Sequence, residues 1–165
     1  MTKCDILIIK IKIVKSFSYF SVTNLNNDFL HCIMTKTRIV AMIVQDERLL
    51  MEKGEDSIEL WTPGGKLEEG ESDIECLRRE LREELCVDLV SAKFFKEYHG
   101  FSFYNPDMRM IQRVHIVTIS GTPKPDAEIE SVIFLSKEDF EQKKYPMIPI
   151  NEEDILPDII KAGVW

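Results

Sequence analysis

The sequence predicts an α/β fold of the sandwich type, in which helices pack on a mixed β-sheet. Segments rich in β-branched and aromatic residues are interleaved with a few segments of helical periodicity. The chain has 165 residues, 44% of them apolar, which suits one domain with a substantial hydrophobic core. It contains no internal repeat and no low-complexity segment that would indicate another architecture.

Residues 1–33 differ in pattern from the rest of the chain. Isoleucines alternate with lysines over residues 9–13, as in a half-buried strand, and residues 24–28 are typical of a turn. One interpretation is a hairpin packed on the main domain. The other is that Met34 is the physiological start and that the upstream stretch is over-extended translation. In both, residues 34–165 form the main domain.

The main domain opens with a predicted β-hairpin. Residues 38–44 and 49–53 are apolar and rich in β-branched or aliphatic side chains, and the polar residues 45–48 between them favour a turn. A further short strand is predicted at residues 58–61, between two loops rich in glycine and acidic residues.

A helix is predicted from Ser72 to Leu85. Ser72 and Glu75 form an S-x-x-E capping box, so the first helical residue should be Asp73. Apolar residues spaced by three, four and four positions form one buried stripe along it: Ile74, Leu77, Leu81 and Leu85.

The later elements complete the expected sheet. Strands are predicted over residues 91–104, 108–121 and 129–136, and helices over residues 137–144 and within residues 152–162. An Asn-Pro-Asp turn separates the first two of these strands. Ser136 is expected to cap the first helix, and Pro157 to disturb the last one.

Three glutamates, Glu80, Glu83 and Glu84, share one face of the predicted helix, beside its apolar stripe. A solvated surface helix would explain many such faces, and the spacing of Glu75, Arg79 and Glu83 partly supports that interpretation. However, Glu80 and Glu84 repel each other, and Glu83 and Glu84 lie at the negative end of the helix dipole. A divalent cation would reverse these unfavourable terms, and oxygen ligands favour Mg²⁺ or Mn²⁺ over zinc.

The stretch from Gly65 to Val87, GKLEEGESDIECLRRELREELCV, resembles the Nudix box. That pattern is Gly, five residues, Glu, seven residues, Arg-Glu, an apolar residue, one residue, Glu-Glu, one residue, Gly and an apolar residue. The matching positions are Gly65, Glu71, Arg79, Glu80, Leu81, Glu83, Glu84 and Val87. Only Cys86 departs, because it stands in place of the last Gly. The preceding WTPGG also resembles the family's approach to the box.

The chain is therefore similar to the MutT-like Nudix hydrolase family, which implies an α/β/α sandwich with a mixed β-sheet. It also implies hydrolysis of a diphosphate linked to another group, with Mg²⁺ or Mn²⁺ held by the box helix. The metal ligands implied by the resemblance are the Gly64 backbone carbonyl and the carboxylates of Glu80, Glu83, Glu84 and Glu128, with Glu130 as an alternative to Glu128.

The resemblance also assigns roles within the box. Arg79 would orient the glutamates with Glu71 as its partner, and Glu83, or else Glu80, would be the general base. Cys86 occupies a position where a left-handed residue is common. If that conformation is needed, Cys86 costs about 1 kcal/mol relative to glycine and the turn is strained; otherwise the helix ends differently. We therefore expect Cys86 to affect local stability and assign it no catalytic role.

Aromatic residues at the end of the strand predicted over residues 91–104 are candidates for base recognition. Stacking and hydrogen bonding to a base are expected from Phe101, Phe103, Tyr104 and Asn105, although alternating strand residues that pack a core explain them equally well. Trp61 could likewise line the pocket, or it could simply pack under the loop.

The expected substrate is a nucleoside triphosphate or nucleoside diphosphate-X, with a modest preference for an oxidised triphosphate such as 8-oxo-dGTP. ADP-ribose and dinucleoside polyphosphates remain alternatives. A non-catalytic Nudix-fold nucleotide-binding module is a further alternative, but the complete set of box glutamates favours an enzyme.

The overall composition narrows the expected partners and location. A net charge of −8 argues against a general nucleic-acid or anionic-membrane binder. The four cysteines form no CxxC pair, and the apolar N-terminal stretch is broken by lysines, which favours neither a signal peptide nor a membrane span. We expect a cytoplasmic monomer or homodimer with reduced thiols.

Overall fold

A mixed five-stranded sheet forms the centre of the computed structural model, which describes residues 35–165. Both interpretations of residues 1–33 lie outside the described residues. The strands are β1 (Thr35–Gln45), β2 (Arg48–Gly54), β3 (Asp88–Phe101), β4 (Arg109–Ser120) and β5 (Ile129–Leu135), in the spatial order β3-β4-β1-β2-β5. The helical elements are α1 (Asp73–Leu85), α2 (Lys137–Glu141), the π-helical η1 (Asn151–Ile155) and α3 (Leu156–Lys161).

The strand pairing confirms a mixed sheet. β1 pairs with β4 in parallel, whereas β1–β2, β2–β5 and β3–β4 are antiparallel. The predicted first hairpin is confirmed, and Asp46 and Glu47 in its turn have φ angles of 47° and 61°. Positive φ at both central residues matches the right-handed twist of the flanking strands.

The short strand predicted at residues 58–61 is wrong as a full strand. Within this range only Leu60 and Trp61 form isolated bridges, Leu60 with Met147 and Trp61 with Glu52 of β2. The following residues leave β2 and run beside β1, where the Ala41 amide donates to the Pro63 carbonyl at 2.9 Å. β1 thus positions the glycine-containing loop at residues 63–66.

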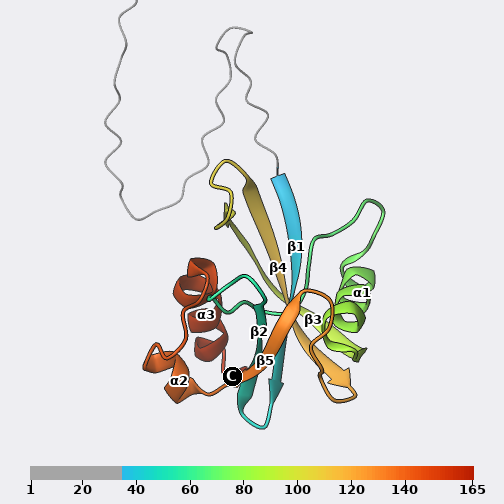
Figure 1. The fold of residues 1–165 in the computed structure, drawn as a ribbon. Helices are drawn as coiled ribbons and strands as arrows, with labels where there is room; N and C mark the ends of the chain where they lie inside the picture. The colour runs from blue at the N-terminus through green and yellow to red at the C-terminus, as the bar shows by residue number, and fades with distance from the viewer. Residues whose placement is uncertain (1–34) are drawn as a thin grey trace, which may run out of the picture. The chain divides into compact units, whose positions relative to one another are not determined.

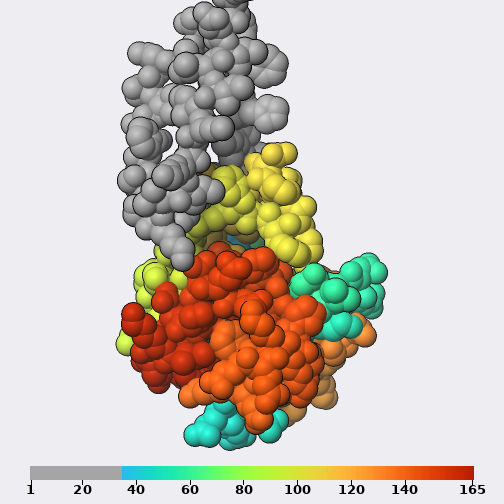
Figure 2. Space-filling model, turned by 90° about the vertical axis from the view of Figure 1, so that its left-hand side faces the viewer, coloured from blue at the N-terminus to red at the C-terminus, as the bar shows by residue number. Residues whose placement is uncertain are grey.

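Helices cover both faces of the sheet, which confirms the α/β/α sandwich (Figure 1). Alternate residues of β1 face opposite sides. One core joins β1 and β2 to α1: Ile39, Ala41, Ile43 and Leu50 pack with Cys76, Leu77, Leu81 and Leu85. The other core joins them to the C-terminal segment: Val40, Met42, Leu49 and Met51 pack with Ile155, Leu156, Ile159 and Trp165. Figure 2 shows the face that the segment after β5 covers, in orange and red.

The helix α1 begins as predicted. The Ser72 hydroxyl accepts a hydrogen bond from the Glu75 amide, and the Ser72 amide donates to the Glu75 carboxylate at 2.8 Å. The predicted stripe is fully buried at its last three leucines, whereas Ile74 is half-buried. The fully buried Cys76 extends the stripe on the side that faces the glycine loop.

The end of α1 shows the strain expected at Cys86. Cys86 has φ 55° and ψ 34°, in the left-handed region. Its amide donates to the Arg82 carbonyl and the Val87 amide donates to the Leu81 carbonyl, both at 3.2 Å. This pattern closes the helix as in a Schellman motif, in which the left-handed position is usually glycine.

The C-terminal helices differ in length from the prediction. α2 ends at Glu141, short of the predicted range, and Lys143 follows with a φ of 50°. The last helical segment begins with a π-turn, in which the Leu156 amide donates to the Asn151 carbonyl. Pro157 lies in the first turn of α3, where its missing N–H is tolerated. Within residues 35–165, no helix is long and apolar enough to cross a membrane.

Candidate active site

The glycine loop lies against β1 so closely that a side chain is excluded at Gly64. Gly64 has a φ of 112°, and a Cβ atom there would stand 2.2 Å from the Ile39 carbonyl oxygen. The Gly64 amide donates to the Glu84 carboxylate at 3.0 Å. The loop and the last turn of α1 are therefore joined directly.

The carboxylate of Glu80 lies on the next residue of the loop. A Cβ atom at Gly65 would stand 1.9 Å from Glu80 Oε1, so glycine leaves the space that this carboxylate occupies. The Gly65 carbonyl accepts from the Ile39 amide at 2.8 Å, which fixes the loop below the carboxylate.

Arg79 connects three glutamates of the stretch from Gly65 to Val87, namely Glu71, Glu80 and Glu83. Its Nε and Nη2 donate to the two oxygens of Glu71, each at 3.0 Å. Its Nη1 donates to Glu80 Oε1 at 2.7 Å and reaches Glu83 Oε2 at 3.5 Å. Hydrogen bonds from Arg79 lower the pKa of Glu71, and those it donates to Glu71 and Glu80 raise the pKa of Arg79.

The three glutamates predicted to share one face differ greatly in exposure. Glu84 is only 6% exposed, whereas the side chains of Glu80 and Glu83 are 13% and 57% exposed. Burial raises the pKa of Glu84, although Arg38 and the Gly64 amide oppose that effect. Glu84 is thus buried in the interior, Glu80 lies against Gly65 of the glycine loop, and Glu83 faces solvent.

The loop before β5 is attached to the end of α1. The amides of Lys124 and Asp126 donate to the Leu85 and Glu84 carbonyls, each at 2.9 Å. The same loop carries Glu128, whose negative charge contributes to the raised pKa of Glu84. Glu128 and Glu84 also line the cavity described below. Glu130, the alternative to Glu128, instead forms an ion pair with Lys53.

A further carboxylate, Glu52 of β2, was not predicted. It is 0% exposed, and neither side-chain oxygen has a hydrogen-bond partner among residues 35–165. Burial, and then the neighbouring Glu84, raise the pKa of Glu52. In the sequence, Glu52 directly follows three apolar residues of a strand, which could have indicated a buried carboxylate. The sequence alone does not show toward which face of the sheet its side chain points.

The donor set suits a hard divalent cation. The side chains that meet at this end of the glycine loop offer carboxylate oxygens, and the loop adds peptide carbonyls, which are ligands that Mg²⁺ and Mn²⁺ accept. The unpartnered oxygens of Glu52 add unused acceptor capacity. Within the described part of the chain, no three Asp, Glu, His or Cys side chains already converge closely enough to hold an ion. Glu80 and Glu84 are instead engaged by Arg79 and by the Gly64 amide.

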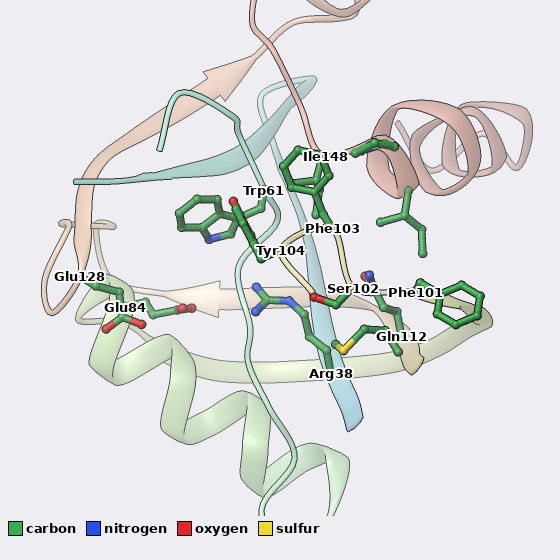
Figure 3. A pocket seen from close by; sticks show the side chains of 13 residues that line it. Arg38, Trp61, Glu84, Phe101, Ser102, Phe103, Tyr104, Gln112, Glu128 and Ile148 are labelled. Atoms are coloured by element: carbon green, nitrogen blue, oxygen red, sulfur yellow. The ribbon is translucent and has the colours of Figure 1, made fainter. Parts of the chain in front are cut away.

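A cavity of about 320 Å³ opens beside these carboxylates (Figure 3). Glu84 and Glu128 lie at one end, and aromatic, polar and aliphatic side chains line the rest. The lining residues are Arg38, Trp61, Glu84, Phe101, Ser102, Phe103, Tyr104, Met110, Gln112, Glu128, Ile148, Pro149 and Ile150.

Three of the four predicted base-binding residues line this cavity: Phe101, Phe103 and Tyr104. Asn105 does not line it; its side-chain oxygen accepts from the Asp107 amide at 3.2 Å within the turn. Trp61 lines the cavity as well, which was one of its two interpretations.

Sequence reasoning missed the polar residues on the cavity's other walls. Arg38 of β1 lies in the cavity and donates to the Thr62 carbonyl at 2.9 Å, and Gln112 of β4 is buried there. Asn151 directly follows the wall residues 148–150, is fully buried, and has no hydrogen-bond partner for its amide among the described residues. These residues come from elements far apart in the sequence, and no local motif marks them.

Comparison with known proteins points to one family. Residues 35–158 match the family model described as NUDIX domain. No curated protein matches the chain.

Solved structures share the fold. The chain is similar to a NUDIX hydrolase from Nitrosomonas europaea, with 22% identity, a TM-score of 0.66, and coverage of 78% of this chain and 90% of that one. It is also similar to the E. coli ORF135 protein, with 23% identity, a TM-score of 0.60, and coverage of 76% and 89%. A MutT NUDIX hydrolase from Burkholderia pseudomallei shows 22% identity, a TM-score of 0.57, and coverage of 62% and 84%.

Proposed function

Because the chain belongs to the Nudix hydrolase family, and is therefore a pyrophosphohydrolase, we propose that it hydrolyses the diphosphate linkage of a nucleotide with the help of a divalent cation. The observation that carries this proposal is the contact between the glycine loop, residues 63–66, and α1, which we call the signature helix because it carries the box glutamates. Glu80 and Glu84 both rest on that loop, and Arg79 orients Glu80. Glu84 also lines, together with Glu128, a cavity large enough for part of a nucleotide.

We assign Mg²⁺ or Mn²⁺ as the cation. The residues that would hold it are the Gly64 carbonyl and the carboxylates of Glu80, Glu83, Glu84 and Glu128. When bound, the cation neutralises the diphosphate and polarises a phosphoryl oxygen. Arg79 holds Glu80 and Glu71 in place, so that the orientation of the glutamates does not depend on the cation alone.

Glu83 is our candidate for the general base. Its side chain is 57% exposed and only weakly held, at 3.5 Å from Arg79 Nη1. It can therefore meet a solvent water and take its proton as that water attacks phosphorus. Glu80 is the less favoured candidate. Its Oε1 already accepts a hydrogen bond of 2.7 Å from Arg79 and is therefore less free to take a proton from water.

We propose a nucleoside triphosphate as the substrate, preferably an oxidised one such as 8-oxo-dGTP. A volume of about 320 Å³ lies near the lower end for ligand pockets, which favours one nucleoside over a dinucleoside polyphosphate. Trp61, Phe103 and Tyr104 offer aromatic faces for stacking, and Gln112 offers an amide for hydrogen bonding.

A substrate panel tests this proposal. Purified full-length protein should be assayed with Mg²⁺ against 8-oxo-dGTP, the ordinary nucleoside triphosphates, ADP-ribose and a dinucleoside polyphosphate. We expect the highest kcat/KM for 8-oxo-dGTP, a loss of at least about 100-fold in Glu83→Gln, and no loss in the exposed control Glu153→Gln. Absence of turnover with every substrate, or an undiminished rate in Glu83→Gln, would contradict the mechanism. If kcat/KM fell in Glu80→Gln but not in Glu83→Gln, Glu80 would be identified as the general base.

We also propose a cytoplasmic location. In the described part of the chain, Cys76 and Cys86 are free thiols, as is usual in a reducing compartment.

A further inference from the structure

Glu52 points toward the signature helix because of its place in β2. Successive side chains of a strand face opposite sides, and Leu50 packs in the core beneath α1, so Glu52 lies on the same side as Leu50. Val132, its partner in β5, also packs against that core. Two backbone hydrogen bonds with Trp61, of 2.8 and 3.0 Å, hold Glu52 from the other side. The backbone therefore cannot rotate this side chain toward solvent.

The carboxyl group of Glu52 is buried without compensation from the protein. Neither oxygen has a hydrogen-bond partner among residues 35–165, although burial of a polar group without a partner is costly. Trp61 lies close enough to influence Glu52, but no hydrogen bond of normal geometry forms. Arg38, the nearby cation, donates instead to the Thr62 carbonyl at 2.9 Å.

Two carboxylates and one cation act on the charge of Glu52: Glu84, Glu80 and Arg38. Glu84 acts on it more strongly than Arg38 does, and Glu80 also contributes. A water molecule would satisfy the oxygens of Glu52 but leave like charges together. A divalent cation would satisfy the oxygens and attract both buried carboxylates, so it fits this place better than water does.

We propose that Glu52 is an additional carboxylate ligand of the divalent-cation site, supplied by β2 from outside the signature motif. This inference rests on the proposed function, because it concerns the same cation. It extends the ligand set to a strand that the motif does not include, and it gives the two unpartnered oxygens a role.

Direct measurement of Mn²⁺ binding tests the inference without substrate. Free Mn²⁺ should be followed by electron paramagnetic resonance while full-length wild type, Glu52→Gln and Glu153→Gln are titrated. Glutamine preserves the shape of Glu52 but removes its charge. We expect Mn²⁺ affinity to fall at least tenfold in Glu52→Gln and to stay at the wild-type value in Glu153→Gln.

Thermal unfolding separates a ligand from a residue that only supports the fold. The quantity to compare is the rise in Tm that Mn²⁺ causes relative to EDTA. A ligand role predicts that this rise is strongly reduced in Glu52→Gln while Tm in EDTA is not lowered. A purely structural role would change Tm in EDTA and leave the rise intact, which would overturn the inference. Glu52→Met gives a second folded variant if Glu52→Gln is poorly expressed, and the same loss is expected.

The two proposals fail in different ways. Wild-type protein that binds Mn²⁺ but hydrolyses no diphosphate would contradict the proposed function, while a loss of Mn²⁺ binding in Glu52→Gln would still support Glu52 as a ligand. Active wild type together with unchanged Mn²⁺ affinity in both Glu52 variants would overturn only the inference about Glu52.

Discussion

The guanidinium of Arg79 and the carboxylate of Glu71 form a bidentate pair, with both N···O distances at 3.0 Å. The remaining nitrogen of Arg79 holds Glu80, so one planar group aligns two carboxylates. A lysine keeps the positive charge but cannot reproduce this fork.

Arg79→Lys should therefore lower kcat/KM by about 10- to 100-fold, the usual effect of losing a group that orients metal ligands. Steady-state assays with Mg²⁺ would measure the loss, and circular dichroism would confirm the fold. The adjacent, exposed Arg78→Lys is the matched control and should retain full activity. Equal activities in the two variants would show that the fork is not needed.

The same pair predicts a pH-dependent contribution to stability. Hydrogen bonds from Arg79 lower the pKa of folded Glu71 below its ordinary value of 4.5. The unfolded state therefore binds more protons in this range, so the contribution is present above pH 4.5 and is lost as the pH falls through the folded pKa.

Glu71→Gln should lower the free energy of unfolding by about 1 kcal/mol at pH 7, because the partners are partly exposed and solvent weakens the pair. Urea unfolding at pH 7 and pH 3 would measure it, and the difference from wild type should shrink at pH 3. Glu69→Gln is a suitable control, since Glu69 is exposed and has no ion pair within residues 35–165. A difference that stays constant with pH would contradict this assignment.

Cys86 predicts a stabilising substitution. Its φ of 55° is strained for a residue with a side chain, and glycine removes that strain. Cys86→Gly should raise the free energy of unfolding by about 1 kcal/mol without loss of activity. Cys86→Ala is the control, because it removes the thiol and its 3.5 Å contact with Asp126 but keeps the strained backbone. If Cys86→Ala stabilises the protein as much as Cys86→Gly does, the strain is not the cause.

The two loop glycines should respond differently to the same substitution. At Gly64 an added Cβ meets the backbone oxygen of Ile39 at a φ of 112°, and neither can move easily. Gly64→Ala should therefore destabilise the fold by about 1 to 3 kcal/mol. At Gly65 the Cβ meets the movable carboxylate of Glu80.

Gly65→Ala should change stability by less than about 1 kcal/mol but lower activity by about 100-fold, because Glu80 must leave its place. Chemical unfolding and kinetics of both variants would test the contrast. Normal activity in Gly65→Ala would show that the position of Glu80 on the loop is not required.

Trp61 should affect substrate binding more than turnover. Loss of a stacking partner costs about 1 to 3 kcal/mol per base, so Trp61→Ala should raise KM by about 5- to 150-fold. Phe94→Ala is the control, since Phe94 is exposed on β3 and does not line the cavity. A fall in kcat with unchanged KM would mean that Trp61 supports the fold of the loop and does not bind the base.

Local patterns predicted the elements whose causes are local. The capping box at Ser72 and the apolar stripe of α1 depend only on neighbouring residues, and both are confirmed. The strand at residues 58–61 was wrong because β1 draws the following segment away after one bridge to β2.

Long-range packing explains what the sequence did not reveal in the site. Glu84 and Glu83 are adjacent in the signature, yet one is buried by the glycine loop and the other faces solvent. Glu52 and Asn151 are buried without partners because distant elements close over them, and no spacing in the sequence records this.

The loop of residues 124–128 forms the cap of the signature helix. Its amides occupy the Glu84 and Leu85 carbonyls, which would otherwise have no partner at the helix end. Opening this loop would therefore fray the last turn of α1 as well as withdraw Glu128. The loop and the helix end thus belong to one cooperative unit, so local opening of one should be accompanied by local opening of the other.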